Sequence, residues 1–371
     1  MKLRCLSLHD IFQDVRDNKR KIVMFGAGVI GQITVPEMLR EHDLLDYIDC
    51  YIDNDPDKWD NVISLYGRSF NIKSPEYLSH CNGNAVVFVN ISRYAEVVEQ
   101  LNSMQCTRNM LCYIMPMICI HDLCSRESAG SPVMRLQPVI PKKIHYMWIG
   151  GKQLPDNLQK CIESWKKYCP DYEIIEWNES NYDIKKNRYM AQAYECGAYG
   201  FVPDYARIDI LYHEGGIYMD TDVELKRNID DMLYQDAFCG VEKWQILNMG
   251  GCSGAVKGQT MLGKLLDLRK KICFIDDNGR QNRKTCGFYD TKVALENGYL
   301  MNGTTQCIDG MNIYAYDYFH PYDYMSGITN CTSNTHSIHH FNGGWLDEKS
   351  KMMNEKTSKE YMQLYNACIN N

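Results

Sequence analysis

The sequence lacks several patterns that would place a chain in a class at once. No two cysteines have the CxxC spacing, and the densest set, Cys112, Cys119 and Cys124, lacks the ligand spacing of a structural zinc site. The longest apolar stretch, Met110 to Ile120, contains Pro116 and is about half as long as the roughly 20 residues of a membrane-spanning helix. The G-x-x-x-x-G-K-[ST] motif is absent as well, which excludes a P-loop enzyme.

Charge of one sign is not in large excess. Lys and Arg total 40 against 47 Asp and Glu, the formal net charge is −7, and no long basic run occurs. We therefore expect no binding to nucleic-acid backbones. Behind the basic start MKLRCLSLHD there is no apolar signal region, so the 17 cysteines are expected to stay reduced in a cytoplasmic protein.

The composition is that of a globular chain. Hydrophobic residues make up 45% and charged residues 23% of 371 residues, a length that suits about two domains. Apolar strands alternate with helical segments, which predicts an α/β fold. The segment SRESAGSPVMRLQP is rich in Ser, Gly and Pro and has no periodicity. We therefore predict a first domain over 1–125, a linker over 126–138 and a second domain over 139–371.

The first domain opens with a strand, a glycine turn and a helix. In KIVMFGAGVIGQ, Gly26, Gly28 and Gly31 follow an apolar run, and Asp53 ends the next strand about 20 residues later. This order predicts a small parallel Rossmann-like layer in which these four residues are candidates for binding a nucleotide, with NAD as the candidate cofactor. Glycines in such a turn also serve close helix packing, and that alternative is the one we favour.

The second domain contains a short helix that ends at two glycines. In FVPDYARIDILYHEGGIYMDTDVEL, Pro203 suits the first helical turn, and Gly215 and Gly216 end the helix. Asp204 and Arg207 are three residues apart, so they share one helix face. They are either site residues or a surface ion pair of small worth.

Two carboxylates follow in the strand predicted over GIYMDTDV. Alternation places Tyr218, Asp220 and Asp222 on one side of this strand. Hard divalent cations in phosphate enzymes are held by one or two carboxylates together with phosphate oxygens. The DxD pattern is therefore typical of a metal–diphosphate site, although acids at strand ends are more often only solvated.

A pair of histidines lies near the end of the chain, in SIHHFNGGW. Adjacent residues of a strand point to opposite faces, so at most one of His339 and His340 can reach a site shared with the carboxylates. The alternative is one core imidazole and one surface imidazole. Imidazole together with carboxylates suits Mn²⁺, so a late histidine is a candidate third ligand.

Three motifs of the second domain occur in the order found in a known family. IPKKIHYMWIGG, PDYARIDILYHEGGIYMDTDV and SIHHFNGGW, over residues 139–346, resemble glycosyltransferase family 32, the group of capsular-polysaccharide and yeast initiating mannosyltransferases. The resemblance implies a GT-A fold for the second domain, a nucleotide-sugar donor, Mn²⁺ or Mg²⁺ as cofactor, and retention at the anomeric carbon. The first domain, with VMFGAGVIG and YIDNDPDKWD, resembles a Rossmann-like module attached to bacterial polysaccharide enzymes and sugar acyltransferases.

The same resemblance implies roles for the donor site. Trp148 would stack on the donor base, with a buried core tryptophan as the alternative, and Tyr218 would lie against the base or ribose. Asp204 and Arg207 would bind the donor sugar. Asn248, in LNMGGCSGAV, is a further candidate for the sugar pocket.

It also implies roles in catalysis. Asp220 and Asp222 would hold the metal and diphosphate, His340 falls at the late metal ligand, and the Trp345 indole would reach the leaving phosphate. Gly343-Gly344 stands where the family often has a hydroxyl residue, so the third metal ligand stays open.

The predicted function is a metal-dependent retaining glycosyltransferase that builds capsular or other surface polysaccharide. The resemblance of Trp148 and Tyr218 to the aromatic residues of the large clostridial glucosylating toxins implies a UDP-sugar. The expected acceptor is a saccharide, either a lipid-linked or a growing oligosaccharide, for a protein that visits the inner face of the cell membrane. One alternative is an NAD-dependent oxidoreductase or sugar-nucleotide-modifying enzyme centred on the first domain, which lacks a Tyr-x-x-x-Lys pair. Another is a scaffold with both sites inactive, against which the intact DxD argues.

Overall fold

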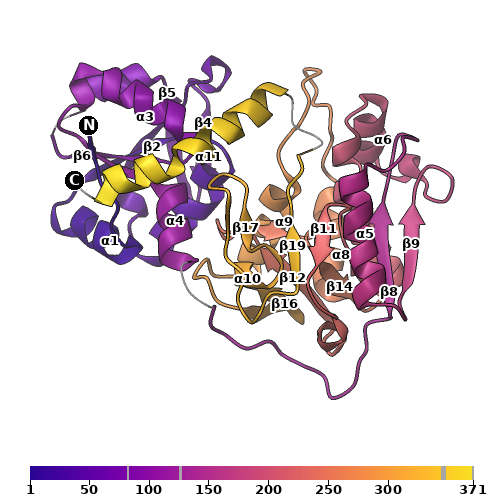
Figure 1. The fold of residues 1–371 in the computed structure, drawn as a ribbon. Coiled ribbons are helices and arrows are strands. Elements are labelled where there is room, and N and C mark those ends of the chain that lie inside the picture. Colours follow the sequence, from indigo (N-terminus) through magenta and orange to yellow (C-terminus); the bar gives the residue numbers. More distant parts are fainter. Residues whose placement is uncertain (82, 125–127, 344–347, 370–371) are drawn as a thin grey trace. The chain divides into compact units, whose positions relative to one another are not determined.

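The structure, a computed structural model, describes the chain in four stretches: 1–81, 83–124, 128–343 and 348–369. The chain separates into two compact units, and each is described by itself (Figure 1). The first unit comprises Met1–Ser125, Tyr324–Gly327 and Glu348–Asn371, and the second comprises Arg126–Asp323 and Ile328–Asp347. The closing helix thus groups with the first unit, whereas the sequence placed it in a domain over 139–371. The boundaries at 125 and 138 stay a prediction.

The first unit is built on one seven-stranded sheet, in the order β1-β7-β6-β2-β3-β5-β4. Its neighbouring strands are parallel except for β4 and β5, which are antiparallel. The strands are β1 (Lys2–Leu3), β2 (Lys21–Phe25), β3 (Ile48–Ile52), β4 (Val62–Leu65), β5 (Arg68–Lys73), β6 (Ala85–Val89) and β7 (Leu111–Ile114).

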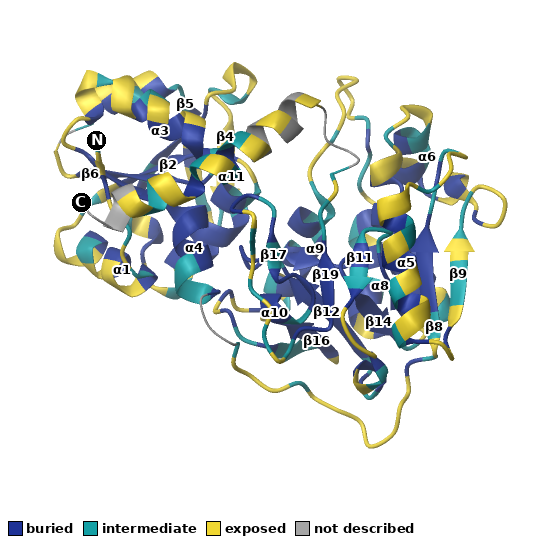
Figure 2. Ribbon diagram, in the orientation of Figure 1, coloured by how far each residue is buried: buried dark blue, intermediate teal, exposed yellow. Residues whose placement is uncertain are grey.

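Helices cover this sheet because its central strands are apolar on both faces. All five residues of β6 are buried, as parallel strands between helix layers require (Figure 2). The helices of the unit are α1 (Leu8–Asp17), α2 (Val35–Glu41), α3 (Tyr94–Ser103), α4 (Met115–Leu123) and α11 (Glu348–Ile369), and a π-helical turn, Ile30–Thr34, leads into α2. α11 contacts α3, and its Lys356 pairs with Glu99 of α3 at 3.2 Å.

The second unit is built on a mixed eight-stranded sheet. Its order is β15-β16-β12-β14-β10-β8-β9, with β13 paired to β12, and β8–β9, β8–β10 and β12–β16 are the parallel pairs. The strands of this sheet are β8 (Lys143–Met147), β9 (Glu173–Trp177), β10 (Gly216–Tyr218), β12 (Ala237–Val241), β13 (Leu247–Asn248), β14 (Ser253–Ala255), β15 (Gln306–Ile308) and β16 (Met311–Tyr314).

Among the described residues, two small two-stranded sheets and six α-helices complete the second unit. β11 (Val223–Leu225) pairs with β19 (Ser337–His339), and β17 (Tyr322–Asp323) pairs with β18 (Ile328–Thr329). The helices are α5 (Asp156–Tyr168), α6 (Arg188–Glu195), α7 (Pro203–Glu214), α8 (Thr260–Arg269), α9 (Cys286–Glu296) and α10 (Tyr316–Phe319). The core lies under α5 and around β10 and β11, where the side chains of Trp165, Ile217 and Phe238 are fully buried.

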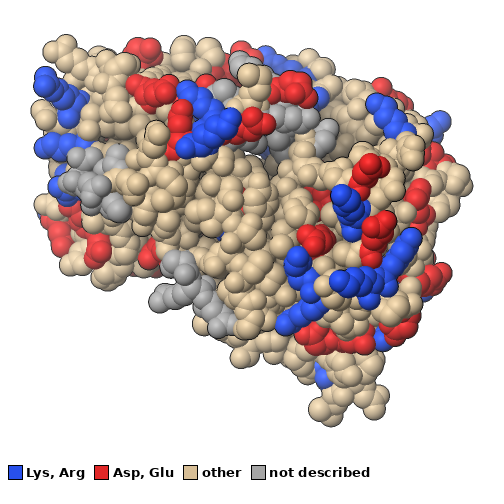
Figure 3. Space-filling view, viewed as in Figure 1, with Lys and Arg blue, Asp and Glu red and all other residues tan. Residues whose placement is uncertain are grey.

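The surface is mixed in charge. On the face drawn in Figure 3, basic and acidic side chains of the described residues are interspersed, without a continuous field of either sign. Among the described residues, no helix combines the length and the apolar character needed to cross a bilayer.

Candidate functional site

α7 brings Asp204 and Arg207 into the interior of the second unit. The helix begins at Pro203, which occupies the first helical position, and ends at Gly215, whose φ of +66° is costly for residues with a Cβ. Asp204 is 5% and Arg207 4% exposed. The pair is therefore buried, and the alternative of a surface ion pair does not apply.

The Arg207 guanidinium lies between two carboxylates. One nitrogen, Nη2, is 3.4 Å from Asp204 Oδ1 and 3.4 Å from Asp220 Oδ1, and Nε donates to the Pro203 carbonyl at 3.1 Å. Burial raises the pKa of Asp204 to about 6, and Arg207 opposes that rise. Asp204, Arg207 and Asp220 thus form one group of charged side chains, of which the first two are buried.

The two acids of the DxD lie in a turn, not in a strand. β10 ends at Tyr218 and β11 begins at Val223, so the alternation predicted over GIYMDTDV stops before Asp220. The Asp220 N–H donates to the Gly250 carbonyl at 2.8 Å, and the Val223 N–H donates to the Asp220 carbonyl at 3.1 Å. This turn lets Asp220 face Arg207 while the chain continues into β11.

β19 places a histidine beside these acids. It runs antiparallel to β11, with His339 opposite Val223. The His339 Nε2 lies 3.2 Å from Asp222 Oδ1. Asp220, Asp222 and His339, called the acidic cluster below, each offer one ligand atom, and these atoms all lie within 4.8 Å of one another.

His340, the predicted metal ligand, lies elsewhere. Its Nε2 is 3.1 Å from Glu224 Oε2, and its N–H donates to the Asp222 carbonyl at 3.0 Å. Successive residues along β19 point to opposite sides, so the side chain next to His339 turns away from the acidic cluster. The structure therefore brings His339, and not His340, to the carboxylates.

Within the acidic cluster, Asp222 and His339 stabilise each other's charged forms. Burial alone would raise the pKa of Asp222, but the charge and hydrogen bond of His339 outweigh it and lower that pKa to about 2. For His339 the two effects have the opposite signs: burial lowers its pKa, but the charge and hydrogen bond of Asp222 outweigh burial, so the pKa of His339 is raised. His339 Nδ1 is buried and has no hydrogen-bond partner among the described residues. Two carboxylates and an imidazole whose Nε2 faces them fit a divalent cation.

The aromatic candidates differ in exposure. Trp148 follows β8, is half-buried, and donates from its indole N–H to the Lys152 carbonyl at 2.5 Å. Tyr218 is fully buried, its ring lies 5.7 Å from the Arg207 guanidinium carbon, and its hydroxyl has no hydrogen-bond partner among the described residues. Tyr218 thus lies beneath Arg207, while Trp148 keeps part of its ring accessible. Trp345 lies outside the described residues.

Asn248 is held inside the protein. Its side-chain N–H₂ donates to Glu242 Oε1 at 2.8 Å, and its Oδ1 accepts from the Gly250 N–H at 2.9 Å. Gly250 leaves no room for a side chain, because a Cβ there would lie 2.1 Å from Asp220 Oδ2. The sequence pointed to Asn248 but not to Glu242 or to the reason for the glycine. The double glycine in LNMGG was the available signal.

A second buried pair was also not predicted. Arg269 of α8 and Asp290 of α9 form an ion pair of 2.7 Å with both side chains at most 2% exposed. Arg269 also donates to the Cys286 carbonyl at 2.9 Å, and Arg207 Nη1 donates to Cys286 Sγ at 3.7 Å. This links the start of α9 to α7. The partners are 21 residues apart, so no local pattern announces them.

The predicted nucleotide-binding residues of the first unit lie at the glycine turn after β2, where one glycine and Asp53 make close internal contacts. A Cβ on Gly31 would lie 2.0 Å from the Gly26 carbonyl oxygen, whereas Gly28 faces open space. Asp53 Oδ2 accepts from the Ala27 N–H at 2.8 Å and pairs with Lys58 at 3.1 Å. The carboxylate therefore stabilises the glycine turn, which agrees with the packing alternative for the glycines.

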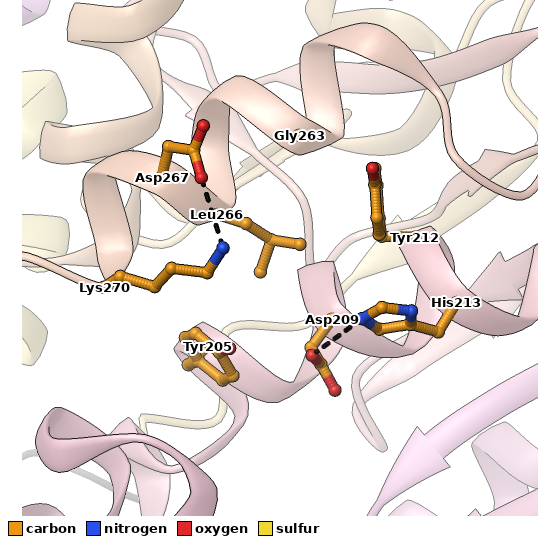
Figure 4. A pocket seen from close by; sticks show the side chains of 8 residues that line it. All are labelled: Tyr205, Asp209, Tyr212, His213, Gly263, Leu266, Asp267 and Lys270. Carbon is orange, nitrogen blue, oxygen red and sulfur yellow. Dashed lines mark hydrogen bonds and ion pairs between the residues drawn. The ribbon is translucent and has the colours of Figure 1, made fainter.

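A cavity of about 150 Å³ lies between α7 and α8 (Figure 4). It is lined by Tyr205 and Tyr212, by Asp209, which is 3.5 Å from His213, and by Lys270. None of the acidic cluster lines it, so we assign the site to the cluster and not to this cavity.

Known proteins share the central part of the second unit. Residues 155–239 match the family model described as a glycosyltransferase sugar-binding region containing a DXD motif. Subversion of eukaryotic traffic protein A of Legionella pneumophila is 24% identical over 184 residues, 41% of this chain and 28% of that protein. Inositol phosphoceramide mannosyltransferase 2 of Schizosaccharomyces pombe is 33% identical over 106 residues, 26% of this chain and 29% of that protein.

The aligned segment thus spans less than a third of either curated relative. A solved structure, PaToxG Glycosyltransferase, superposes with a TM-score of 0.34 and 18% identity, covering 55% of this chain and 78% of that one. The predicted α/β class is confirmed by the two large sheets and the helices that accompany them. A DXD region of this kind typically binds a divalent metal. Part of the chain is therefore similar to a glycosyltransferase sugar-binding region and to a mannosyltransferase.

Proposed function

We propose that the chain is a metal-dependent, retaining glycosyltransferase that uses a nucleotide-sugar donor, and that its site is the acidic cluster with Asp204 and Arg207. The observation that carries this is the convergence of Asp220, Asp222 and His339, with ligand atoms within 4.8 Å, at the DXD of the matched segment. Glycosyltransfer needs stabilisation of charge on a departing nucleoside diphosphate. A Mn²⁺ or Mg²⁺ ion held by these three residues would supply it.

The chain's own residues would divide the remaining work. Arg207 is fixed by Asp204 and Asp220, so its guanidinium is oriented before the donor sugar binds. Asp204 is an acceptor for sugar hydroxyls at the start of α7. Trp148, half-buried at the end of β8, supplies a face on which the base can stack.

The first experiment measures thermal unfolding with UDP-, GDP- and CMP-sugars and with NAD, each with and without Mn²⁺. A ligand that binds only the folded chain raises the melting temperature. We expect a UDP-sugar to raise it, and only with metal. NAD acting alone, with every nucleotide sugar silent, would instead point to an oxidoreductase centred on the first unit.

The second experiment measures release of nucleoside diphosphate by Asp222→Asn. The amide keeps the size of the side chain but removes the charge that pairs with His339, so we expect metal-dependent turnover to fall to background with the fold intact. Asp267→Asn, at an exposed carboxylate paired with Lys270, is the matched control and should keep full activity. Undiminished turnover in Asp222→Asn removes this residue from the site.

The acceptor we propose is a saccharide of capsular or other surface polysaccharide, lipid-linked at the inner face of the cell membrane. The support is the motif resemblance over residues 139–346. Transfer of a radiolabelled sugar to a lipid-linked oligosaccharide, compared with the same oligosaccharide free in solution, tests this. Transfer only to the free oligosaccharide contradicts a lipid-linked acceptor. The anomeric configuration of the new glycosidic bond, compared with that of the donor, tests retention.

A further inference from the structure

A hairpin between β12 and β13 ends beside the DXD turn. Glu242 is the first residue after β12, and its backbone closes the hairpin turn: its N–H donates to the Ile246 carbonyl at 2.8 Å and its carbonyl accepts from the Gln245 N–H at 2.8 Å. The Glu242 backbone is therefore fixed. Its carboxylate is directed back across the hairpin to the Asn248 side chain.

Three hydrogen bonds in series connect that carboxylate to the DXD. Glu242 Oε1 accepts from Asn248 Nδ2 at 2.8 Å, Asn248 Oδ1 accepts from the Gly250 N–H at 2.9 Å, and the Gly250 carbonyl accepts from the Asp220 N–H at 2.8 Å. Asp220 is the residue whose carboxylate lies 3.4 Å from Arg207. No step in the series passes through solvent.

The chemistry of the first bond fixes the direction of the others. An asparagine amide has a donor end and an acceptor end, and a half-turn of its side chain exchanges them. Burial raises the pKa of Glu242, while the Asn248 hydrogen bond and His339 oppose that rise. The ionised Glu242 carboxylate can only accept, so the NH₂ of Asn248 faces it and donates to Oε1. The carbonyl end of Asn248 is then left for the Gly250 N–H.

The orientation of the Asn248 amide affects the site because Asn248 holds Gly250, and Gly250 lies against Asp220 and Arg207. A Cβ at Gly250 would lie 2.1 Å from Asp220 Oδ2 and 2.6 Å from Arg207 Nη1, so the loop approaches both groups as closely as a backbone can. A shift of Gly250 by a fraction of an ångström therefore moves the Asp220 backbone and its carboxylate together.

We propose that Glu242 is a positioning residue for the metal site: through Asn248 and Gly250 it holds Asp220 in the orientation that the acidic cluster requires. This inference rests on the proposed function, because it takes Asp220 as a metal ligand. Loss of a residue that hydrogen-bonds to a metal ligand typically weakens metal affinity about 10- to 100-fold.

The test exchanges the donor and the acceptor. At a pH at which both side chains are ionised, the N248D side chain can only accept, so it faces the Glu242 carboxylate without a hydrogen between them. We expect its dissociation constant for Mn²⁺, from the EPR signal of the free ion, to rise about 10- to 100-fold. The double variant E242Q/N248D supplies an amide donor at 242 and keeps an acceptor at 248 for the Gly250 N–H. We expect it to bind Mn²⁺ nearly as well as the wild type.

E242Q alone is the conservative control, because its amide oxygen still accepts from Asn248, and we expect wild-type affinity. Far-UV circular dichroism and the melting temperature in EDTA check that each variant folds. If N248D does not fold, E242A takes its place, since it leaves the Asn248 NH₂ without its acceptor, and E242Q is then the rescue.

The outcomes separate the two proposals. A wild-type chain that takes up no Mn²⁺ contradicts the proposed metal site itself. If the wild type binds Mn²⁺ and N248D binds it equally well, or E242Q/N248D is no better than N248D, the positioning role of Glu242 is overturned while the metal site stands. Loss in N248D with recovery in the double variant is a result that general destabilisation does not produce.

Discussion

At the scale of single residues, Asp222 links the site to stability. Its pKa is lowered to about 2 in the folded protein, mainly because His339 outweighs the cost of burial. An acid with a depressed folded-state pKa contributes stability that is complete above its unfolded pKa, near 4, and is lost as the pH falls through about 2. From this shift, the contribution is about 2 kcal/mol.

We therefore expect Asp222→Asn to differ from the wild type more at pH 5 than at pH 2. Urea unfolding measures the free-energy difference between the two proteins. EDTA is added so that a bound metal does not contribute to it. The free-energy difference between the two proteins should shrink by about 2 kcal/mol between these pH values. An equal difference at both would mean that the His339–Asp222 pair does not form in solution. Asp267→Asn should show little difference at either pH.

Trp148 gives a second prediction at this scale. A base stacked on an aromatic ring is stabilised by about 1 to 3 kcal/mol, so Trp148→Ala should weaken donor binding by roughly that amount and leave kcat nearly unchanged. Isothermal titration with a UDP-sugar and Mn²⁺ measures it. Unaltered donor affinity together with lower stability would mean that Trp148 serves only as a core residue, packed against the hydrophobic core around β8.

At the scale of elements, Gly250 tests how tightly the loop after β13 approaches the DXD turn. Gly250→Ala adds a Cβ that would lie 2.1 Å from Asp220 Oδ2, a movable side-chain atom, so the chain can fold but the carboxylate must shift. A displacement of about 1 Å at a reacting site can cost about 100-fold in rate. We expect turnover to fall by about that factor, with the melting temperature little changed. Wild-type turnover would show that the turn adapts.

Gly263→Ala is a glycine substitution of the opposite kind. Gly263 lies within α8, and a Cβ there would be 3.4 Å from the Tyr212 ring, an ordinary contact. Alanine restricts the unfolded chain and favours helix, so we expect the free energy of unfolding to rise by about 0.5 to 1 kcal/mol with turnover unchanged. Chemical denaturation measures it. Destabilisation would mean that the α7–α8 cavity cannot accept the methyl group.

Elements with a strong local pattern were predictable, and those set by distant partners were not. The helix from Pro203 to its glycine stop, and the strand before the glycine turn at Gly26, follow from periodicity and capping alone. The extent of β10 does not, because Asp220 gives its N–H to Gly250, which is 30 residues away in the sequence. Likewise, only the register of β11 with β19 decides between His339 and His340.

At the scale of the whole molecule, thiols test the burial pattern. The 16 cysteines whose side chains the structure describes are free, and Cys106, Cys196 and Cys331 are the exposed ones among them. We expect the native protein to react rapidly with a thiol reagent at these three positions, and the buried thiols to react only on unfolding. The triple serine variant should lose about three fast-reacting thiols per chain. A fast phase that persists undiminished would contradict the described exposure.

The acidic cluster is assembled from sequence segments that lie far apart. Two ligand candidates fall within the matched stretch 155–239, but His339 and the loop at Gly250 do not. Under the proposed function, a homologue can therefore retain the DXD and still be inactive because of one substitution far downstream, at His339. Surveys that score activity by that motif alone would count such pseudoenzymes as active. Comparison of the residues at the positions of Glu242, Asn248, Gly250 and His339, in addition to the motif, would separate active homologues from inactive ones.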